Sequence, residues 1–217
     1  MKLFIDSGNL KDIETLVAIG IIDGVTTNPT LLAKEPGDYR ENLKKICQIV
    51  KGPVSGEVTA TDVNGMLQQG REIAKIDQHM IVKVPLTRAG IQACKTLSGE
   101  GIRVNVTLCF SAAQALLAAE AGATFVSPFV GRLDDIAMNG MDLIREIVEI
   151  YNNYDFTTEI LVASCRHPIH VTEAARMGAD IATCPPAVID QLFNHPLTNI
   201  GLEKFLKDWE KSQAVKA

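Results

Sequence analysis

Ala-Gly-Ala-Thr-Phe-Val-Ser-Pro, residues 121–128, carries the pattern that decides the fold: a helix end, a tight turn at Gly122, a strand from Phe125 and an exit at Pro128. Residues 177–185, Met-Gly-Ala-Asp-Ile-Ala-Thr-Cys-Pro, repeat this order. The similarity is too short to prove internal duplication. It does predict repeated units in which a helix leads into a parallel strand.

Short runs rich in β-branched residues recur along the chain, with helical segments between them. Eight such units in 217 residues leave roughly 27 residues for each, which favours a compact α/β fold, a (β/α)8 TIM barrel. The length also suits an open doubly wound sheet, but an open sheet usually needs fewer strands. The expected strands are 2–5, 24–26, 54–58, 80–84, 103–108, 125–127, 160–163 and 181–183.

Signals for helix starts and stops lie between these strands. Asn28 followed by Pro29 is typical of an N-cap with proline at the first helical position. Ser111 with Gln114 is typical of a capping box, and Gly178 falls where a helix should end. The chain therefore alternates between helix and strand.

A further amphipathic segment follows the last unit. We expect one barrel domain over residues 1–195 and a C-terminal helical extension over residues 196–217. An additional helix has no place in the ring of the barrel, so it would dock either on a neighbouring subunit or on the flank of the barrel. Its apolar face would carry Leu202, Phe205, Leu206 and Trp209.

Composition and charge exclude several classes of protein. The chain is 47% hydrophobic and 22% charged, as in an ordinary globular domain. Its net charge is −5 and it contains no basic run, so we expect neither nucleic acid nor an anionic membrane as a partner. No apolar stretch approaches the roughly 18 residues that span a bilayer. A cytoplasmic protein is the default expectation.

The sequence lacks the usual motifs for metals and nucleotides. The five cysteines are scattered and lack metal-ligand spacing, which favours reduced thiols that only pack. His167 and His170 stand three apart beside Pro168, without an H-E-x-x-H pattern. G-x-x-x-x-G-K-S/T, G-x-G-x-x-G and G-x-S-x-G motifs are also absent. We therefore expect no cofactor.

Polar residues stand at the ends of nearly all the expected strands. Barrel enzymes build their active sites at the C-terminal ends of the strands, so these residues are the candidates for function. They are Asp6, Thr26, Asn28, Glu57, Lys83, Asn105, Thr107, Ser127, Arg132, Ser164 and Arg166.

Lys83 is the least expected of them, because it interrupts the apolar run 80–85. Burying an ammonium group is costly. One interpretation is a lysine that reaches from the strand tip to solvent. The other is an amine that desolvation keeps as free base, able to attack a carbonyl group.

Two carboxylates and two arginines would share this end of the barrel. Asp6 and Glu57 could divide proton-transfer roles with the amine, although alone Asp6 could be a helix cap and Glu57 a surface acid. Arg132 and Arg166 follow the sixth and seventh strands, where barrels often bind phosphate, although each could be a solvated loop charge. Their number at one end favours a functional site.

The motifs together resemble the transaldolase family, specifically its short members, over essentially the whole chain. The resemblance lies in LFID (3–6), GVTTNPT (24–30), VKVP (82–85), NVTL (105–108), SPFVGR (127–132) and ASCR (163–166). It implies a (β/α)8 barrel that uses a lysine Schiff base, without metal or organic cofactor. The implied reaction moves a dihydroxyacetone unit between sugar phosphates.

The resemblance also implies residue roles. Lys83 would form the Schiff base, Asp6 would handle the proton of the C4 hydroxyl, and Glu57 with Thr107 would position a catalytic water. The implied substrate-binding residues are Asn28, Asn105 and Ser127 for donor hydroxyls, Arg132, Arg166 and Ser164 for phosphate, and Thr26 and Phe129 as further contacts.

Two alternatives remain on the same fold. The family includes fructose-6-phosphate aldolases, which release free dihydroxyacetone. That type is associated with glutamine, tyrosine and lysine where this chain has Glu57, Phe129 and Arg166, so the resemblance favours transaldolase. A catalytically silent sugar-phosphate binder is the other alternative. Short members are typically ring-built oligomers, so a homo-oligomer, a decamer or pentamer through the C-terminal helix, is expected.

Overall fold

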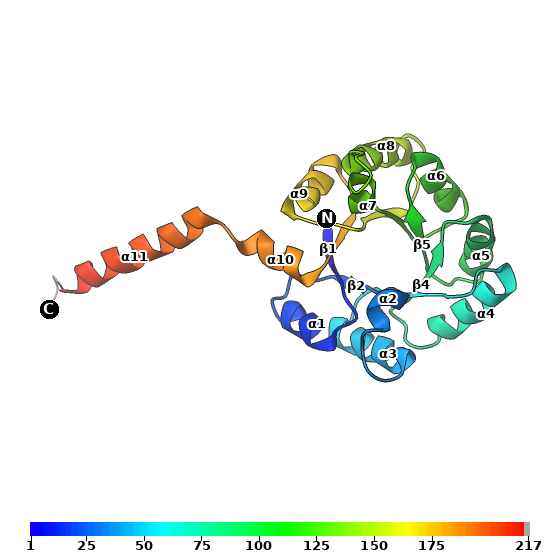
Figure 1. Ribbon diagram of the computed structural model, residues 1–217, viewed down its shortest axis with the longest axis horizontal. Helices are drawn as coiled ribbons and strands as arrows, with labels where there is room; N and C mark the ends of the chain where they lie inside the picture. The colour runs from blue at the N-terminus through cyan, green and yellow to red at the C-terminus, as the bar shows by residue number, and fades with distance from the viewer. Residues whose placement is uncertain (215–217) are drawn as a thin grey trace.

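A computed structural model describes residues 1–214 and contains a closed barrel of eight parallel strands. The strands pair in chain order and β8 closes onto β1 (Figure 1). This closure confirms the (β/α)8 prediction and excludes an open sheet. The strands are β1 Lys2–Asp6, β2 Gly24–Thr26, β3 Val54–Glu57, β4 Met80–Pro85, β5 Val104–Cys109, β6 Phe125–Pro128, β7 Glu159–Val162 and β8 Ile181–Cys184.

All eight strands lie where they were predicted, but several ends differ because pairing with neighbours sets them. Val58 falls outside β3, although its N–H still donates to the carbonyl of Lys83 at 3.0 Å. β7 begins one residue early, where Glu159 pairs with Phe125. Ala163 then forms only an isolated bridge with Phe129. These end effects are invisible in a run of β-branched residues.

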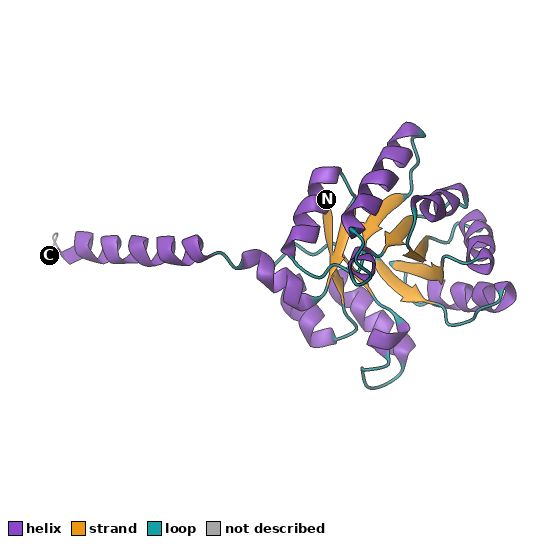
Figure 2. Cartoon of the chain, turned by 45° about the horizontal axis from the view of Figure 1, so that its top comes forward, coloured by secondary structure: helices purple, strands orange, loops and turns teal. Residues whose placement is uncertain are grey.

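Most of the helices form a ring outside the strands (Figures 1 and 2). Asn28 caps α2 by accepting from Leu31 N–H, and Ser111 caps α6 by accepting from Gln114 N–H, as predicted. Gly178 ends α9 in the left-handed conformation at φ 87°. The helices are α1 Leu10–Val17, α2 Pro29–Leu32, α3 Tyr39–Val50, α4 Val63–Ala74, α5 Arg88–Gly99, α6 Ala112–Glu120, α7 Val130–Asp134, α8 Gly140–Asn153, α9 Pro168–Met177, α10 Pro186–Phe193 and α11 Pro196–Ala214.

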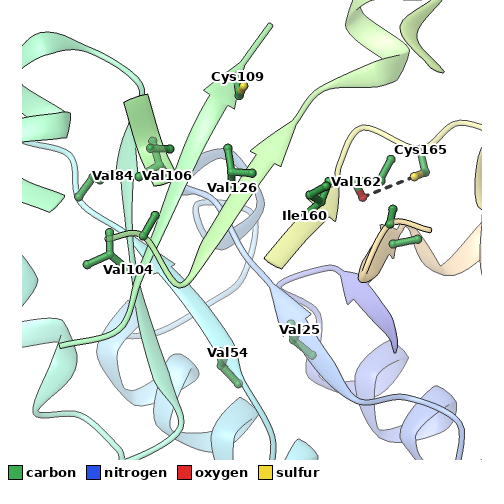
Figure 3. Packing of buried hydrophobic residues seen from close by; sticks show 14 of the residues in the cluster. Val25, Val54, Val84, Val104, Val106, Cys109, Val126, Ile160, Val162 and Cys165 are labelled. Atoms are coloured by element: carbon green, nitrogen blue, oxygen red, sulfur yellow. Dashed lines mark hydrogen bonds between the residues drawn. The ribbon is translucent and has the colours of Figure 1, made fainter. Parts of the chain in front are cut away.

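Two apolar layers hold the barrel together. Valines of the strands, such as Val25, Val54 and Val126, belong to the large cluster that includes the buried faces of the helices (Figure 3). A smaller cluster joins side chains from five strands: Phe4, Ile81, Phe125, Leu161 and Ile181. Strand alternation points these residues to the inner side, where they fill the barrel below its C-terminal end.

The inner packing explains Gly24. A Cβ at this position would lie 2.5 Å from the ring of Phe4, so only glycine leaves room for the phenyl group. The apolar residues close the lower part of the barrel. The polar side chains at the strand ends therefore lie directly above a packed apolar layer.

α11 projects away from the barrel (Figures 1 and 2). Its side chains include exposed Phe205 and Trp209, at 71% and 64%, and the helix has no buried residue. Docking on the barrel's flank, one of the two expected positions, is therefore wrong. The physical reason is the break at 194–195, after which Pro196 starts a helix in a new direction. Residues 215–217 of the expected extension lie outside the described part.

Within residues 1–214 the structure has no helix long and apolar enough to cross a membrane. The five cysteines are all buried and free.

Candidate active site

The strand ends surround two adjoining cavities of about 160 Å³ and 440 Å³. Lys83, Asn28, Phe129 and Arg132 line both of them. The smaller cavity is also lined by Asp6, Thr26, Ser127, Ser164 and Arg166, and the larger by Glu57 and Thr107. Every residue predicted for the site thus lines a cavity except Asn105, which lies buried beside Ser127.

Lys83 lies at the centre of this arrangement. Its side chain is only 6% exposed, so it does not reach out to solvent. Its Nζ donates to the carbonyl of Thr27 at 3.1 Å and lies 3.2 Å from Glu57 Oε2. The register of β3 and β4 pairs Glu57 directly with Lys83. The carboxylate can therefore take up the proton that the amine must lose before it attacks a carbonyl.

Asp6 occupies the end of β1, beside Thr26 of β2. The Thr26 hydroxyl donates to Asp6 Oδ1 at 2.8 Å and lies 2.7 Å from the hydroxyl of Thr183. Burial raises the pKa of the Asp6 carboxyl, against the opposing effects of the Lys83 charge and the Thr26 hydrogen bond. The carboxyl is thus poised to exchange a proton.

A chain of hydrogen bonds lies across the barrel from Asp6. Ser127 Oγ donates to Asn105 Oδ1 at 2.7 Å, and Asn105 Nδ2 donates to Ser55 Oγ at 3.2 Å. These bonds fix the orientation of the Asn105 amide below the cavity. They also fix the hydroxyl of Ser127, which lines the cavity. A ligand would meet oriented polar groups.

Thr107 is exceptional because its hydroxyl is buried and has no hydrogen-bond partner among residues 1–214. The β5–β6 register shifts between Val106 and Cys109, and Leu108 has φ 60°. This irregularity leaves Thr107 and Leu108 both lining the larger cavity. An unpaired buried hydroxyl is costly, so it suits a site that a water or ligand completes.

The two arginines follow β6 and β7 and line the smaller cavity. Arg132 lies over the ring of Phe129, 4.8 Å from its centroid. Arg166 pairs with Asp135 at 2.9 Å and borders the smaller cavity. Gly131 lets α7 approach the 164–166 loop, because a Cβ there would lie 2.7 Å from Arg166 Cγ. Both arginines therefore line the smaller cavity, on segments that pack closely together.

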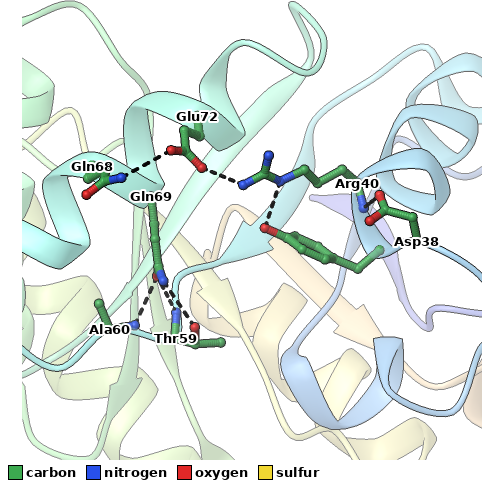
Figure 4. Close-up of polar contacts among 8 residues, drawn as sticks. Asp38, Arg40, Thr59, Ala60, Gln68, Gln69 and Glu72 are labelled. Atoms are coloured by element: carbon green, nitrogen blue, oxygen red, sulfur yellow. Dashed lines mark hydrogen bonds and ion pairs between the residues drawn. The ribbon is translucent and has the colours of Figure 1, made fainter.

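A third cavity, of about 460 Å³, adjoins Glu57 between α2, α3 and α4. Figure 4 shows that polar groups around it are bonded to one another: Gln69 accepts from the N–H groups of Thr59 and Ala60, and Arg40 pairs with Glu72. The bonds to Gln69 hold the loop that follows β3, and the Arg40–Glu72 pair joins α3 to α4.

Sequence reasoning missed several members of the site. Thr183 is the last residue of the expected strand 181–183 and lines the smaller cavity, so the same strand-end rule could have found it. The carbonyl of Thr27, the hydroxyl of Ser55 and the carboxylate of Asp135 carry no such signal, because only folding brings them to Lys83, Asn105 and Arg166. Groups of three or more potential metal ligands do not occur within the described 1–214.

Fold and site together define a class: a (β/α)8-barrel enzyme with a buried lysine–carboxylate pair and two arginines at its strand ends. The family profile described as "Transaldolase/Fructose-6-phosphate aldolase" matches residues 3–216. The chain belongs to this family, as the sequence motifs indicated.

Curated relatives agree with this assignment. A protein of Anaeromyxobacter dehalogenans (strain 2CP-C), named "Probable transaldolase", is 59% identical over 97% of both chains. Proteins with the same name from Kosmotoga olearia and Methanococcus vannielii are 56% and 58% identical, over 97% of this chain and 97% and 98% of theirs.

A solved structure supports the fold independently. Thiamine phosphate pyrophosphorylase from Pyrococcus furiosus matches with a TM-score of 0.59 over 86% of each chain. Its sequence identity is 14%, so this likeness concerns the fold alone.

Proposed function

We propose that this protein is a transaldolase that transfers a dihydroxyacetone unit from a ketose phosphate to an aldose phosphate. The donors would be sedoheptulose 7-phosphate or fructose 6-phosphate, and the acceptors glyceraldehyde 3-phosphate or erythrose 4-phosphate, as in the pentose phosphate pathway. The observation that carries the proposal is the buried Lys83–Glu57 pair at 3.2 Å, in cavities shared with Asp6 and two arginines.

The first step forms an imine on Lys83. After Glu57 accepts a proton from the ammonium, the free Nζ attacks the ketose carbonyl to give a carbinolamine. Loss of water, with a proton returned to the departing oxygen, leaves a protonated imine. Glu57 and Thr107 line one cavity, and the buried Thr107 hydroxyl has no partner among residues 1–214. The two residues therefore suit the water that leaves and later returns.

The second step breaks the C3–C4 bond. Asp6 accepts the proton of the C4 hydroxyl as the aldose product departs, and the electron pair of the broken bond moves into the imine. The resulting enamine attacks the acceptor aldehyde, and Asp6 returns its proton to the new hydroxyl. Water then hydrolyses the imine and releases the new ketose. Every atom balances without an outside oxidant or reductant.

Substrate binding would divide between hydroxyl and phosphate groups. Asn28 and Ser127, with Thr26 nearby, suit the hydroxyls of the donor, since each lines the cavity and offers a donor or acceptor. Asn105, predicted for the same role, is fully buried and would act through its bond to Ser127. Arg132, Arg166 and Ser164 suit the phosphate, because guanidinium groups bind phosphate oxygens in pairs. These roles, and the cytoplasmic location, stay predictions.

Phe129 favours transfer over simple aldol cleavage. Its ring lies at the cavity wall and packs against Phe110 at 5.8 Å between centroids. It cannot donate a proton or bind a water through a polar atom. The enamine would therefore persist until an acceptor aldehyde arrives.

An assay with and without acceptor tests the proposal. Fructose 6-phosphate consumption should depend on added erythrose 4-phosphate, with sedoheptulose 7-phosphate as the product. Equal consumption in both conditions would identify an aldolase instead. Binding of fructose 6-phosphate without any turnover would identify a silent sugar-phosphate binder.

Arg166→Ala tests the phosphate site. We expect KM for fructose 6-phosphate to rise by roughly 10-fold or more, the loss typical of a charge-assisted contact. Imine formation with unphosphorylated dihydroxyacetone should stay normal, because Lys83 is unaffected. Arg176→Gln, a change at an exposed arginine on α9, is the matched control. Unchanged kinetics in the Arg166 variant would remove that residue from the site.

The extension should mediate a homo-oligomer, a decamer or pentamer, in which residues 196–217 reach a neighbouring subunit. Truncation after Asn199 should lower the mass measured by light scattering, because it removes exposed Leu202, Phe205 and Trp209. A double variant of the polar side chains, Glu203→Gln with Lys207→Gln, should retain the assembly. An unchanged mass after truncation would refute this role.

A further inference from the structure

His170 occupies a position that no step above uses. It lies on α9, next to the loop that carries Arg166, and its side chain is only 5% exposed. Its Nδ1 accepts a hydrogen bond from the backbone N–H of Arg166 at 3.2 Å. Its Nε2 lies 3.0 Å from Asp134 Oδ2 on α7. One imidazole therefore joins the two segments that carry Arg132 and Arg166.

We propose that His170 is a positioning residue that holds the two arginines in register for the phosphate of the substrate. The inference rests on the proposed function, because it assumes that these arginines bind phosphate. His170 itself touches no reacting atom; it acts through Arg166 and Asp134.

The bridge continues on the α7 side. The other oxygen of Asp134, Oδ1, accepts from Gly140 N–H at 2.9 Å, where α8 begins. The next residue, Asp135, pairs with the guanidinium of Arg166. The start of α8, the end of α7 and the 164–166 loop are thus tied together at adjacent residues. Loss of His170 would remove the one buried side chain among these ties.

Backbone contacts fix the other side of the same junction. Val130 N–H donates to the carbonyl of Ala163 and Gly131 N–H to that of Ser164, both at 3.1 Å. Ser164 has φ 60°, a conformation that costs energy for a residue with a side chain. The loop that carries Arg166 needs further contacts to hold this conformation. His170 supplies one of them, because its Nδ1 accepts from the backbone N–H of Arg166, two residues after Ser164.

The hydrogen bonds define the protonation state that works. Because Nδ1 accepts from the Arg166 N–H, the proton of the neutral ring lies on Nε2 and is donated to Asp134. A second proton would place an N–H at Nδ1, facing the N–H of Arg166. Two donors cannot bond to one another, so protonation of the ring would release the Arg166 backbone.

Several charged groups surround the ring and set the pH at which this happens. Burial is the main cause that lowers the pKa of His170, and the nearby His167, whose ring centroid lies 3.9 Å away, acts in the same direction. Asp134 and Glu173 oppose this shift, and the Arg166 side chain is itself paired with Asp135. The neutral, bridging form therefore prevails at neutral pH and is lost as the pH falls below the lowered pKa.

Substitutions can separate the two bonds. Because the amide of asparagine falls near the place of Nδ1, His170→Asn should keep an acceptor for Arg166 N–H while losing Asp134. His170→Gln places its amide nearer to Nε2, so it should keep Asp134 and lose Arg166. His170→Ala loses both.

The experiment measures KM for fructose 6-phosphate beside borohydride trapping of unphosphorylated dihydroxyacetone on Lys83. We expect KM to rise roughly 5- to 10-fold in the His170→Ala and His170→Gln variants, the loss of one orienting hydrogen bond. Trapping should be unchanged. His170→Asn keeps the bond to Arg166 and loses only the contact with partly exposed Asp134, so its KM should rise by a smaller factor, about 2- to 3-fold. Arg176→Gln, on the same helix, should leave KM unchanged.

The pH profile supplies a readout that simple packing would not move. KM of the parent should rise at acidic pH more steeply than KM of His170→Asn, whose amide does not titrate. Both proteins meet the same substrate phosphate, so the difference reports His170. The profile needs no alanine variant, and it decides the question even if His170→Ala fails to fold.

Different outcomes would contradict the role of His170 and the proposed Schiff-base function. Unchanged KM in His170→Gln with a parallel pH profile in His170→Asn would overturn the positioning role, with trapping on Lys83 still intact. If the rise in KM came with an equally large loss of trapping on Lys83, His170 would serve only to pack the fold. Absence of trapping in the parent protein would instead refute the proposed Schiff-base function.

Discussion

Replacement of Lys83 by alanine should lower kcat/KM for dihydroxyacetone transfer by at least about 10⁴-fold, since a nucleophile and its covalent intermediate are both removed. Borohydride treatment of the parent protein with fructose 6-phosphate should add the mass of one reduced dihydroxyacetone unit to the peptide carrying Lys83. The variant should gain none. Peptide mass spectrometry and the coupled assay check both results.

Two further variants distinguish lost chemistry from lost structure. Because Lys83 is buried against Glu57, its removal leaves a mostly buried carboxylate without its ion-pair partner. Lys83→Met with Glu57→Gln removes both charges at similar volume, and it should fold normally yet remain inactive. Lys45→Ala, a change at an exposed lysine on α3, should retain activity. An adduct that persists in Lys83→Ala would place the imine elsewhere.

The barrel could be predicted because each of its units carries its own signal. A strand buried on both faces needs consecutive apolar residues, and Val104 and Val106 of β5 continue that pattern around Asn105. The exact strand ends could not be predicted, because they depend on the neighbouring strand. Val58 keeps a hydrogen bond to β4 after its own strand has ended.

The end of the barrel that holds the candidate active site could be predicted for a related reason. Parallel strands in a barrel deliver their C-terminal ends to one place, so Asp6, Glu57 and Lys83 could be grouped before any distance was known. The contacts that orient them were not predictable. Lys83 bonds the carbonyl of Thr27, and His170 lies behind Arg166, through approaches that no local pattern encodes.

The position of α11 shows the limit of an amphipathic pattern. Leu202 and Phe205 indicated a helix face that needs a partner, but the pattern does not specify which surface supplies one. The same stripe is compatible with the flank of the barrel and with another subunit. The structure leaves this face exposed on a projecting helix and so removes the first alternative.

Asp6→Asn should show the second largest effect, a fall in kcat of about 10² to 10⁴-fold, the usual contribution of a positioned acid–base group. The amide has nearly the same shape, but it cannot accept the C4 proton during bond cleavage. Imine formation on Lys83 does not require that transfer. Trapping of unphosphorylated dihydroxyacetone should therefore survive while turnover of fructose 6-phosphate is lost. Asp12→Asn, a change at an exposed aspartate on α1, should change neither.

The pH dependence of kcat should also report the ionisation of Asp6. Asp6 must be ionised to accept a proton, and burial raises its pKa, so the acidic limb should lie above the range of an ordinary aspartate. Thr26 donates to the charged carboxylate, so Thr26→Val should raise the pKa of Asp6 further and move the limb toward neutral pH. Two results together would contradict this role for Asp6: an acidic limb of kcat that does not move in Thr26→Val, and one that is still present in Asp6→Asn. They would assign the proton transfer to Glu57, the other carboxylate beside Lys83. Because Glu57 contacts the amine rather than Thr26, the two carboxylates respond differently to this one substitution.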